Sequence, residues 1–106
     1  MEYSVEEREN VIILKLKEDV LVENFYDLKK LLEELIKKNK DIIIDMQMLN
    51  YVCSQGLGVI TSSLKVLRER GGDIKILKPP PRVLKLLELT RLTKVLQILK
   101  DENELK

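Results

Sequence analysis

One serine in the chain has neighbours that suit phosphate chemistry or protein recognition. Ser54 comes shortly before Gly56 and Gly58 and before apolar residues at helical spacing, so we expect its hydroxyl at the N-terminus of a helix. The first backbone N–H groups of a helix lack partners within it, and the helix dipole is positive there, so a phosphate on Ser54 would be accommodated. The two glycines would let a phosphate oxygen or another protein approach the backbone. On position alone, Ser54 could instead serve only as the helix N-cap.

Catalytic and metal-binding chemistry find little support in the residue types. Histidine is absent, which removes the commonest general base, the usual partner of a nucleophilic serine or cysteine, and the favoured zinc ligand. We therefore expect no metal, no cofactor and no enzymatic activity. A small enzyme is kept as an alternative because Asp41 and Asp45 flank one apolar run, although Asp45 also suits a hydrogen-bond acceptor at a strand end. Cys53, the single cysteine, is either a redox-sensitive thiol or a small buried residue.

The length, charge and hydropathy of the chain limit the classes of protein to which it can belong. The chain has 106 residues, 44% of them apolar, which suits a single domain over residues 1–106. The formal net charge is +1, so we expect no general attraction to nucleic acid or to a membrane surface. No apolar run approaches the ~20 residues that cross a bilayer, and the N-terminus lacks the features of a secretion signal, so we expect a cytoplasmic protein. The many Lys and Glu residues are typical of proteins from hot environments.

Hydrophobic periodicity predicts alternating strands and helices. Runs of β-branched and aliphatic residues mark strands, and apolar residues recurring every three or four positions mark helices. The predicted elements are strands at 3–5 and 11–16, a helix with apolar positions from Phe25 to Ile36 and Asn24 as its N-cap, a strand at 41–46, a helix at 56–70, a strand at 73–77, a short helix begun by the prolines at 79–81, and a strand at 95–99. The order ββαβαβαβ implies an α/β domain.

This alternation predicts a mixed, mostly parallel sheet of four to five strands with right-handed crossovers. The β-branched strand at 41–46 is expected at its centre, with helices covering both faces. In open α/β sheets, binding sites lie in the crevice beyond the carboxyl ends of the strands. The segment at 50–56, which contains Ser54, follows the central strand into that position.

The segment at 42–60 resembles the signature of the STAS domain, which sulfate transporters and anti-sigma factor antagonists share. The family signature is a hydrophobic strand followed by Asp-Ser-Ser-Gly-Leu-Gly, and the local sequence from Cys53 is Cys-Ser-Gln-Gly-Leu-Gly. The similarity continues through the two glycines at 71–72 and through 86–92, which is similar to the family's Leu-Thr-Gly-Leu segment. The resemblance thereby covers nearly the whole chain and implies a STAS-like fold.

Four departures from the family pattern are visible. Cys53 stands where the family has aspartate, Gln55 where it has the second serine, and Arg91 where the later segment has glycine. The family's Gly-x-(Leu/Ile)-Asp after the second strand is replaced by Lys-Glu-Asp-Val-Leu at 17–21. Because the aspartate and its neighbour help partner recognition in the family, these changes bear on the partner rather than on the fold.

The resemblance implies a protein-interaction function under phosphate control. In the family, the serine that matches Ser54 accepts phosphate from an anti-sigma factor that is also a serine kinase. The chain would then be a bacterial anti-sigma factor antagonist that regulates sigma-factor-dependent transcription. A phosphate would add about −1.5 to −2 charges at Ser54 and weaken binding through repulsion and desolvation. Two alternatives are a module that senses a nucleotide or small anion beside Ser54, with weak nucleotide binding, and a scaffold in a larger signalling assembly.

The unmodified domain is expected to dock its serine-containing loop and the following helix against the partner. The residues expected to contact the partner are Tyr51, Cys53, Ser54, Gln55, Gly56, Gly58, Val59, Ser63 and Val66. Burial of the apolar members would supply binding energy. For Val59 and Val66, ordinary packing under a neighbouring element is an equal alternative.

Overall fold

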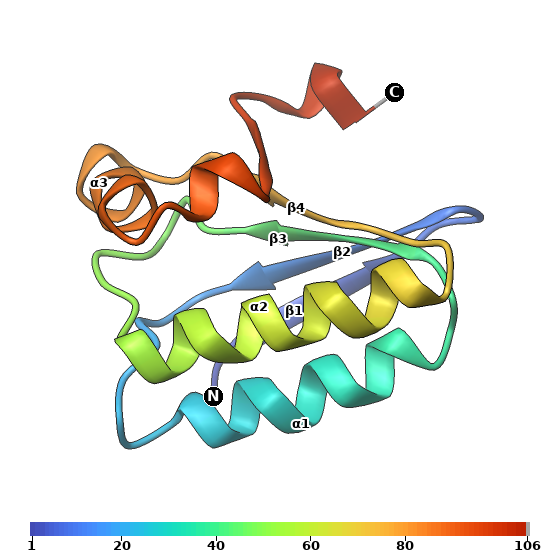
Figure 1. Cartoon of the computed structure of the whole chain (residues 1–106), viewed down its shortest axis with the longest axis horizontal. Coiled ribbons are helices and arrows are strands. Elements are labelled where there is room, and N and C mark those ends of the chain that lie inside the picture. The colour runs from blue at the N-terminus through green and yellow to red at the C-terminus, as the bar shows by residue number, and fades with distance from the viewer. Residues whose placement is uncertain (106) are drawn as a thin grey trace.

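Strands and helices alternate along the chain, as the periodicity predicts (Figure 1). The computed structural model describes residues 1–105. Its elements are β1 (Tyr3–Glu7), β2 (Val11–Leu16), α1 (Phe25–Ile36), β3 (Asp41–Asp45), α2 (Ser54–Glu69), β4 (Ile74–Leu77), α3 (Pro81–Leu89), β5 (Gln97–Leu99), and two 3-10 turns, η1 (Leu92–Lys94) and η2 (Glu102–Leu105). The predicted order ββαβαβαβ is confirmed. Within residues 1–105, none of the helices has the length and hydrophobicity to cross a membrane.

The five strands form one sheet in the order β1-β2-β3-β4-β5. β1 runs antiparallel to β2, and the other neighbouring strands are parallel, so the predicted mixed, mostly parallel sheet is confirmed. β3 lies in the middle, with Ile44 opposite Leu14 of β2 and Ile76 of β4. The parallel strands therefore end at one edge of the sheet, where the loops that lead to the helices begin.

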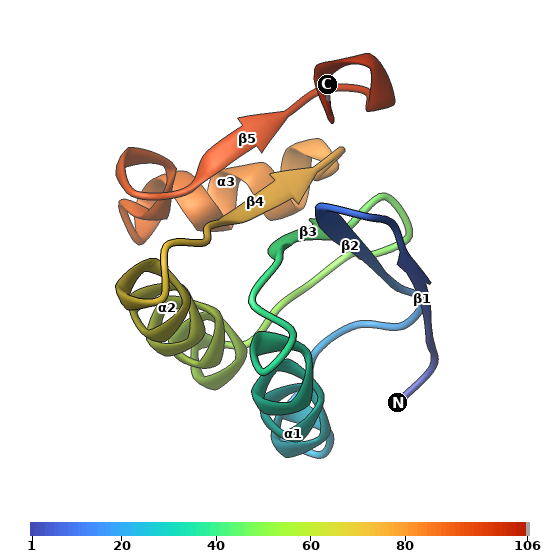
Figure 2. The ribbon, with the colours of Figure 1, turned by 90° about the vertical axis from the view of Figure 1, so that its right-hand side faces the viewer.

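The main core lies between the sheet and the helices. α1 and α2 cover one face of the sheet (Figures 1 and 2), and α3 contributes Val83 and Leu87 to the same core cluster. Alternate strand residues point toward this cluster, because successive side chains of a strand face opposite sides of the sheet. Examples are Ile12, Leu14, Ile42, Ile44, Ile74 and Ile76, all buried.

The opposite face of the sheet has no α-helix packed on it within the described residues. A smaller cluster of Ile43, Leu77 and Leu99 lies there, and Leu105 of η2 packs against it. The prediction that helices cover both faces of the central strand is therefore wrong. The strands from β2 to β5 follow one another in one direction across the sheet, so right-handed crossovers all place their helices on the same side.

The segment between α3 and β5 contains a 3-10 turn that was not predicted, and β5 is shorter than predicted. Residues 92–94 form η1, and β5 begins at Gln97 rather than at residue 95. Arg91 has a φ of 63°, in the left-handed region. A left-handed residue commonly ends a helix, and glycine adopts this conformation most readily. The glycine that the family has at this position therefore has a conformational reason, and Arg91 meets the same requirement without it.

Candidate partner-binding site

The loop before Ser54 is held by a second loop that follows β2. Val20 and Val52 form an isolated parallel bridge. The Cys53 N–H donates to the Val20 carbonyl at 2.8 Å, and the Val20 N–H donates to the Tyr51 carbonyl at 3.2 Å. The parallel pairing of β2 with β3 thus resumes beyond the ends of both strands, and it fixes the backbone immediately before Ser54.

Side chains of the loop at 17–24 strengthen this connection. The Asp19 carboxylate accepts a hydrogen bond from the Asn50 N–H at 2.7 Å. The Asn24 amide donates to Glu18 at 2.9 Å and to the Asp19 carbonyl at 3.0 Å, while its oxygen accepts from the Leu21 N–H at 2.7 Å. Asn24 does occupy the N-cap position of α1, but its side chain makes no capping bond to the helix, so the predicted capping interaction is absent. Asn24 organises its own loop instead.

Glu18 receives two donors within this network. The Glu2 backbone N–H donates to its carboxylate at 2.6 Å, and the Asn24 amide is the second donor. These bonds, with the Glu2 N–H first in importance, lower the pKa of Glu18. Hydrogen bonds to a carboxylate favour its charged form, so the segment before β1 is tied to the same loop while Glu18 is ionised.

The two glycines of the motif have different surroundings. Gly56 is buried, and a Cβ built on it would lie 2.6 Å from Cγ1 of Val20 and 3.1 Å from Cγ1 of Val52. Gly58 is exposed, and a Cβ there would meet no atom within 4 Å. The expectation that both glycines keep the backbone open is therefore wrong for Gly56, which lets the loop at 17–24 pack against α2.

Ser54 is the first residue of α2, and its side chain is exposed. Its hydroxyl donates to the Gln55 side-chain oxygen at 3.4 Å, a long contact that leaves the group accessible. The N-cap is Cys53, whose sulfur accepts from the Gly56 N–H at 3.4 Å, so the alternative that Ser54 caps the helix is wrong. Cys53 is 4% exposed, and this burial favours the interpretation of a small packed residue over an accessible thiol.

Exposed apolar side chains lie on both of the joined loops. Tyr51 is 44% exposed, Met48 is 52% exposed, and Val22 on the facing loop is 61% exposed. Large apolar groups in solvent, when gathered beside a polar rim, commonly mark interaction sites. Sequence reasoning proposed Tyr51 but missed Met48 and Val22. The available signal was an apolar residue between polar neighbours in a loop, which is too common to single out a contact.

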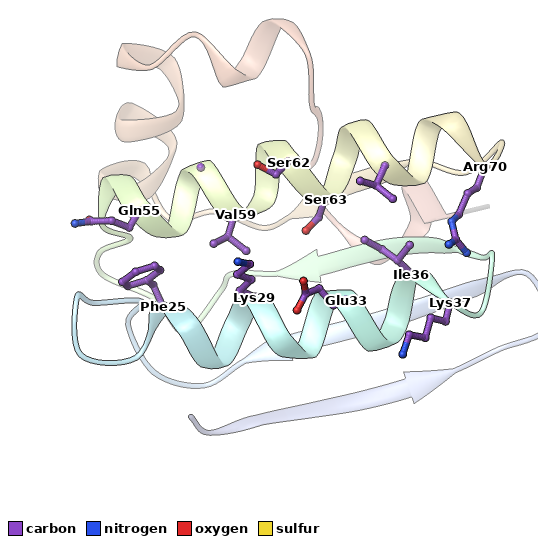
Figure 3. A pocket seen from close by; sticks show the side chains of 12 residues that line it. Phe25, Lys29, Glu33, Ile36, Lys37, Gln55, Val59, Ser62, Ser63 and Arg70 are labelled. Atoms are coloured by element: carbon purple, nitrogen blue, oxygen red, sulfur yellow. The ribbon is translucent and has the colours of Figure 1, made fainter.

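The remaining expected contacts follow α2 along a groove between α1 and α2 (Figure 3). Gln55, Gly58, Val59, Ser63 and Val66 all line this groove, whose volume is about 610 Å³. Gln55, Gly58 and Val66 are exposed, Val59 is half-buried and Ser63 is buried. Residues of α1 form the other wall of the groove. Sequence reasoning missed them because the spacing of apolar residues within one helix does not show which other helix will lie beside it.

The two strand-end acids do not form a catalytic pair. Asp41 begins β3 and Asp45 ends it. Asp41 accepts from the Asp73 N–H at 2.9 Å, and Asp45 accepts from the Gln47 N–H at 2.9 Å. Asp45 is thus a hydrogen-bond acceptor at a strand end, as expected, and the two carboxylates lie at opposite ends of one strand. Within residues 1–105, no cluster of three or more acidic or cysteine side chains could hold a metal ion.

Comparison with known proteins identifies the class. The family model described as the STAS domain matches residues 2–105. The chain therefore belongs to the STAS domain family, which confirms the resemblance found in the sequence. The five-stranded sheet and its helices are the fold of this family.

Particular relatives agree with this assignment. The chain is similar to an anti-sigma-B factor antagonist of Bacillus subtilis, at 27% identity over 94 residues that cover 89% of this chain and 86% of the relative. A crystal structure from Thermotoga maritima, described as a candidate anti-sigma factor antagonist, matches with a TM-score of 0.88 and 28% identity over 96% of this chain and 89% of the other. The phosphorylated form of the Bacillus protein SpoIIAA shares the fold, with a TM-score of 0.75 and 16% identity over 98% and 96% of the two chains.

Proposed function

We propose that this chain is an anti-sigma factor antagonist. It binds an anti-sigma factor in the cytoplasm through the Ser54 end of α2 and the two joined loops, and it thereby frees a sigma factor for transcription. The observation that carries the proposal is the exposed Ser54 at the first turn of α2, in a STAS domain with relatives named as anti-sigma factor antagonists. The function is regulated binding rather than catalysis.

The switch in this proposal is phosphorylation of Ser54 by the partner, which is also a serine kinase. In the unmodified protein, Tyr51, Met48 and Val22 offer apolar area for the interface. A phosphate adds about −1.5 to −2 charges. The loop that packs beside Ser54, at 17–24, carries three acids and one base, so the added charge meets an acidic surface and must be desolvated on binding. Partner binding is then lost.

A matched set of variants tests the switch. Wild type, Ser54→Ala and Ser54→Asp are used to co-purify partners, and Ser4→Asp controls for an added charge at an exposed serine of β1. We expect wild type, Ser54→Ala and Ser4→Asp to retain an anti-sigma factor that Ser54→Asp loses by at least tenfold. Mass spectrometry after incubation with the recovered partner and ATP should place the phosphate on Ser54.

Two outcomes oppose the proposal. Equal recovery of an anti-sigma factor by wild type and Ser54→Asp would contradict a charge switch at this position. Saturable binding of ATP or GTP by the isolated chain, without any protein partner, would favour the alternative of a nucleotide-sensing module.

A further inference from the structure

The outer side of β1 is an open strand edge. β1 is the first strand in the sheet order, and within residues 1–105 no strand lies beyond it (Figure 2). Such an edge offers backbone groups to another strand, and proteins commonly block it with proline, with lysine or by keeping the strand very short. β5, at the other edge of the sheet, has only three residues. β1 has five residues, all of them exposed, and none of them is proline or lysine.

The hydrogen bonds between β1 and β2 show which backbone groups of β1 face outward. The Lys17 N–H donates to the Glu2 carbonyl at 3.0 Å, and the Arg8 N–H donates to the Val11 carbonyl at 2.8 Å. Both pairs continue the register in which β1 and β2 are paired. Because hydrogen-bonded residues alternate along an antiparallel strand, the even-numbered residues from 2 to 8 bond to β2. The N–H and C=O groups of residues 3, 5 and 7 therefore face away from the sheet.

We propose that β1 pairs with β1 of a second copy of this chain, in an antiparallel register centred on Val5. Outward-facing residues then meet outward-facing residues, and the two five-stranded sheets become continuous. The residues that lie opposite each other across the two copies are Val5 and Val5, Tyr3 and Glu7, Ser4 and Glu6, and Glu2 and Arg8. Both copies use the same surface, so the contact closes as a dimer and does not continue into a filament.

The charges along the strand favour this register over its neighbours. Pairing centred on Ser4 would set Glu2 opposite Glu6, and pairing centred on Glu6 would set the two Glu6 side chains opposite each other. Like charges directly opposite each other destabilise a sheet, and opposite charges stabilise it. The register centred on Val5 has no like-charged pair, and it has an acid opposite a base at each end. Among the described residues, the Arg8 side chain bonds through Nε alone, to Glu6 at 2.6 Å, so its other N–H groups are available to Glu2 of the second copy.

The remaining acid of the strand does not oppose the pairing. Glu7 forms ion pairs with Lys38 and Lys40, each at 2.9 Å, which offset its charge, and the residue opposite it is the uncharged Tyr3. Tyr3 and Val5 are 45% and 41% exposed, so the pairing also removes apolar surface from water. A contact along one strand is smaller than the interfaces of stable complexes. We therefore expect a weak and reversible dimer.

Sedimentation equilibrium of the purified chain, from micromolar to millimolar concentrations, measures the association. We expect a monomer–dimer equilibrium without larger species. Amide hydrogen exchange then locates the contact. The Tyr3, Val5 and Glu7 amides should exchange more slowly as the protein concentration rises, whereas the Ser4 and Glu6 amides, which already bond to β2, should change less. A chain that stays monomeric over this range, or a dimer that protects other amides instead, would overturn the proposal.

Two charge reversals test the register. Glu2→Lys and Arg8→Glu should each weaken self-association by about fivefold, the scale of two exposed ion pairs, because each dimer of one variant opposes like charges at both ends. An equimolar mixture of the two variants should regain the wild-type affinity, since the mixed dimer restores both acid–base pairs. Glu88→Lys, the same charge change at an exposed residue of α3, is the control and should associate as wild type does. A mixture that associates no more tightly than its components would contradict this register.

One existing variant separates the dimer from the binding of an anti-sigma factor. Ser4→Asp places an acid opposite Glu6 of the second copy, so it should weaken self-association while it retains the anti-sigma factor. Ser54→Asp should have the opposite effects, because Ser54 is not part of the β1 edge. Loss of self-association in Ser54→Asp but not in Ser4→Asp would place the contact elsewhere and overturn the proposal.

Discussion

At the scale of single residues, the tightest constraint lies between Gly56 and Val20. Any side chain at position 56 would enter the space of the Val20 methyl group, because even a Cβ would lie 2.6 Å from it. Val20 cannot retreat easily, since both of its backbone hydrogen-bonding groups are joined to the Ser54 loop. The loop, the valine and the first turn of α2 therefore depend on the absence of a side chain at one position.

We expect Gly56→Ala to lower the free energy of unfolding by about 1–3 kcal/mol, the usual cost of overpacking a buried site. Gly58→Ala is the matched control, because its methyl group meets open space and alanine is favoured over glycine in a helix by up to ~1 kcal/mol. Urea denaturation of the wild type and both variants measures the difference. Equal losses in the two variants would show that Val20 does not constrain position 56.

The roles of single residues were the least predictable part of the site. Sequence reasoning considered Ser54 as the N-cap, but Cys53 is the cap and Ser54 is the first helical residue. A shift of one residue at the helix start exchanges these roles, and propensity does not fix a helix boundary that finely. The burial of Ser63 likewise depends on the neighbouring helix, so its position in α2 alone could not reveal it.

At the scale of elements, the loop at 17–24 acts as a support for the Ser54 loop. Its backbone pairs with residues 51–53, and Asp19 and Asn24 hold it in shape through side-chain bonds. The family's Gly-x-(Leu/Ile)-Asp pattern is missing from this loop. In this chain the Asp19 carboxylate accepts from the Asn50 N–H, and the Asn24 side chain makes three hydrogen bonds within the loop. A motif comparison would not detect these interactions.

We expect Asn24→Ala to loosen this support without unfolding the domain. Its amide and oxygen make three hydrogen bonds within the loop, and each is worth about 1 kcal/mol. Hydrogen exchange at the Val20 and Cys53 amides should become about fivefold to tenfold faster, because these amides carry the bridge to the Ser54 loop. Asn10→Ala, in the turn between β1 and β2, is the control. Unchanged exchange at both amides would mean that the backbone bridge between Val20 and Val52 holds the Ser54 loop without help from the Asn24 side chain.

The order of the elements was predictable because it follows from local periodicity. The β-branched run before Asp45 indicates a strand, and the spaced leucines of α1 indicate a helix, from patterns that lie within each segment. The placement of helices on one face of the sheet was not predicted, because it depends on the direction in which successive strands are added. The groove between α1 and α2 has the same origin, since neighbouring crossovers set those two helices side by side.

At the scale of the whole molecule, one carboxylate connects the edge of the sheet to the end of the first helix. Glu7 of β1 accepts from Lys38 at 2.9 Å and from Lys40 at 2.9 Å. The hydrogen bond from Lys38, followed by that from Lys40, lowers the pKa of Glu7 from 4.5 to about 2. This interaction joins the hairpin to the segment between α1 and β3.

The depressed pKa of Glu7 predicts a pH dependence of stability. Because the folded-state pKa lies below that of the unfolded chain, the contribution of Glu7 is fully present above about pH 4.5 and is lost as the pH falls toward 2. Glu7→Gln should therefore be less stable than wild type at pH 7, and the difference should vanish near pH 2. Urea denaturation across this range measures it. Glu9→Gln, which removes an acid without an ion pair among the described residues, should show no such convergence.

The strand order has a consequence for synthesis on the ribosome. From β1 to β5, each strand pairs with the strand that precedes it in the sequence. When a strand leaves the exit tunnel of the ribosome, the strand with which it pairs is therefore already outside. No strand has to wait for a later one or be inserted between two others. Pairing between neighbours in the sequence shortens the loops that must close, which favours rapid folding. The sheet can thus grow in step with translation.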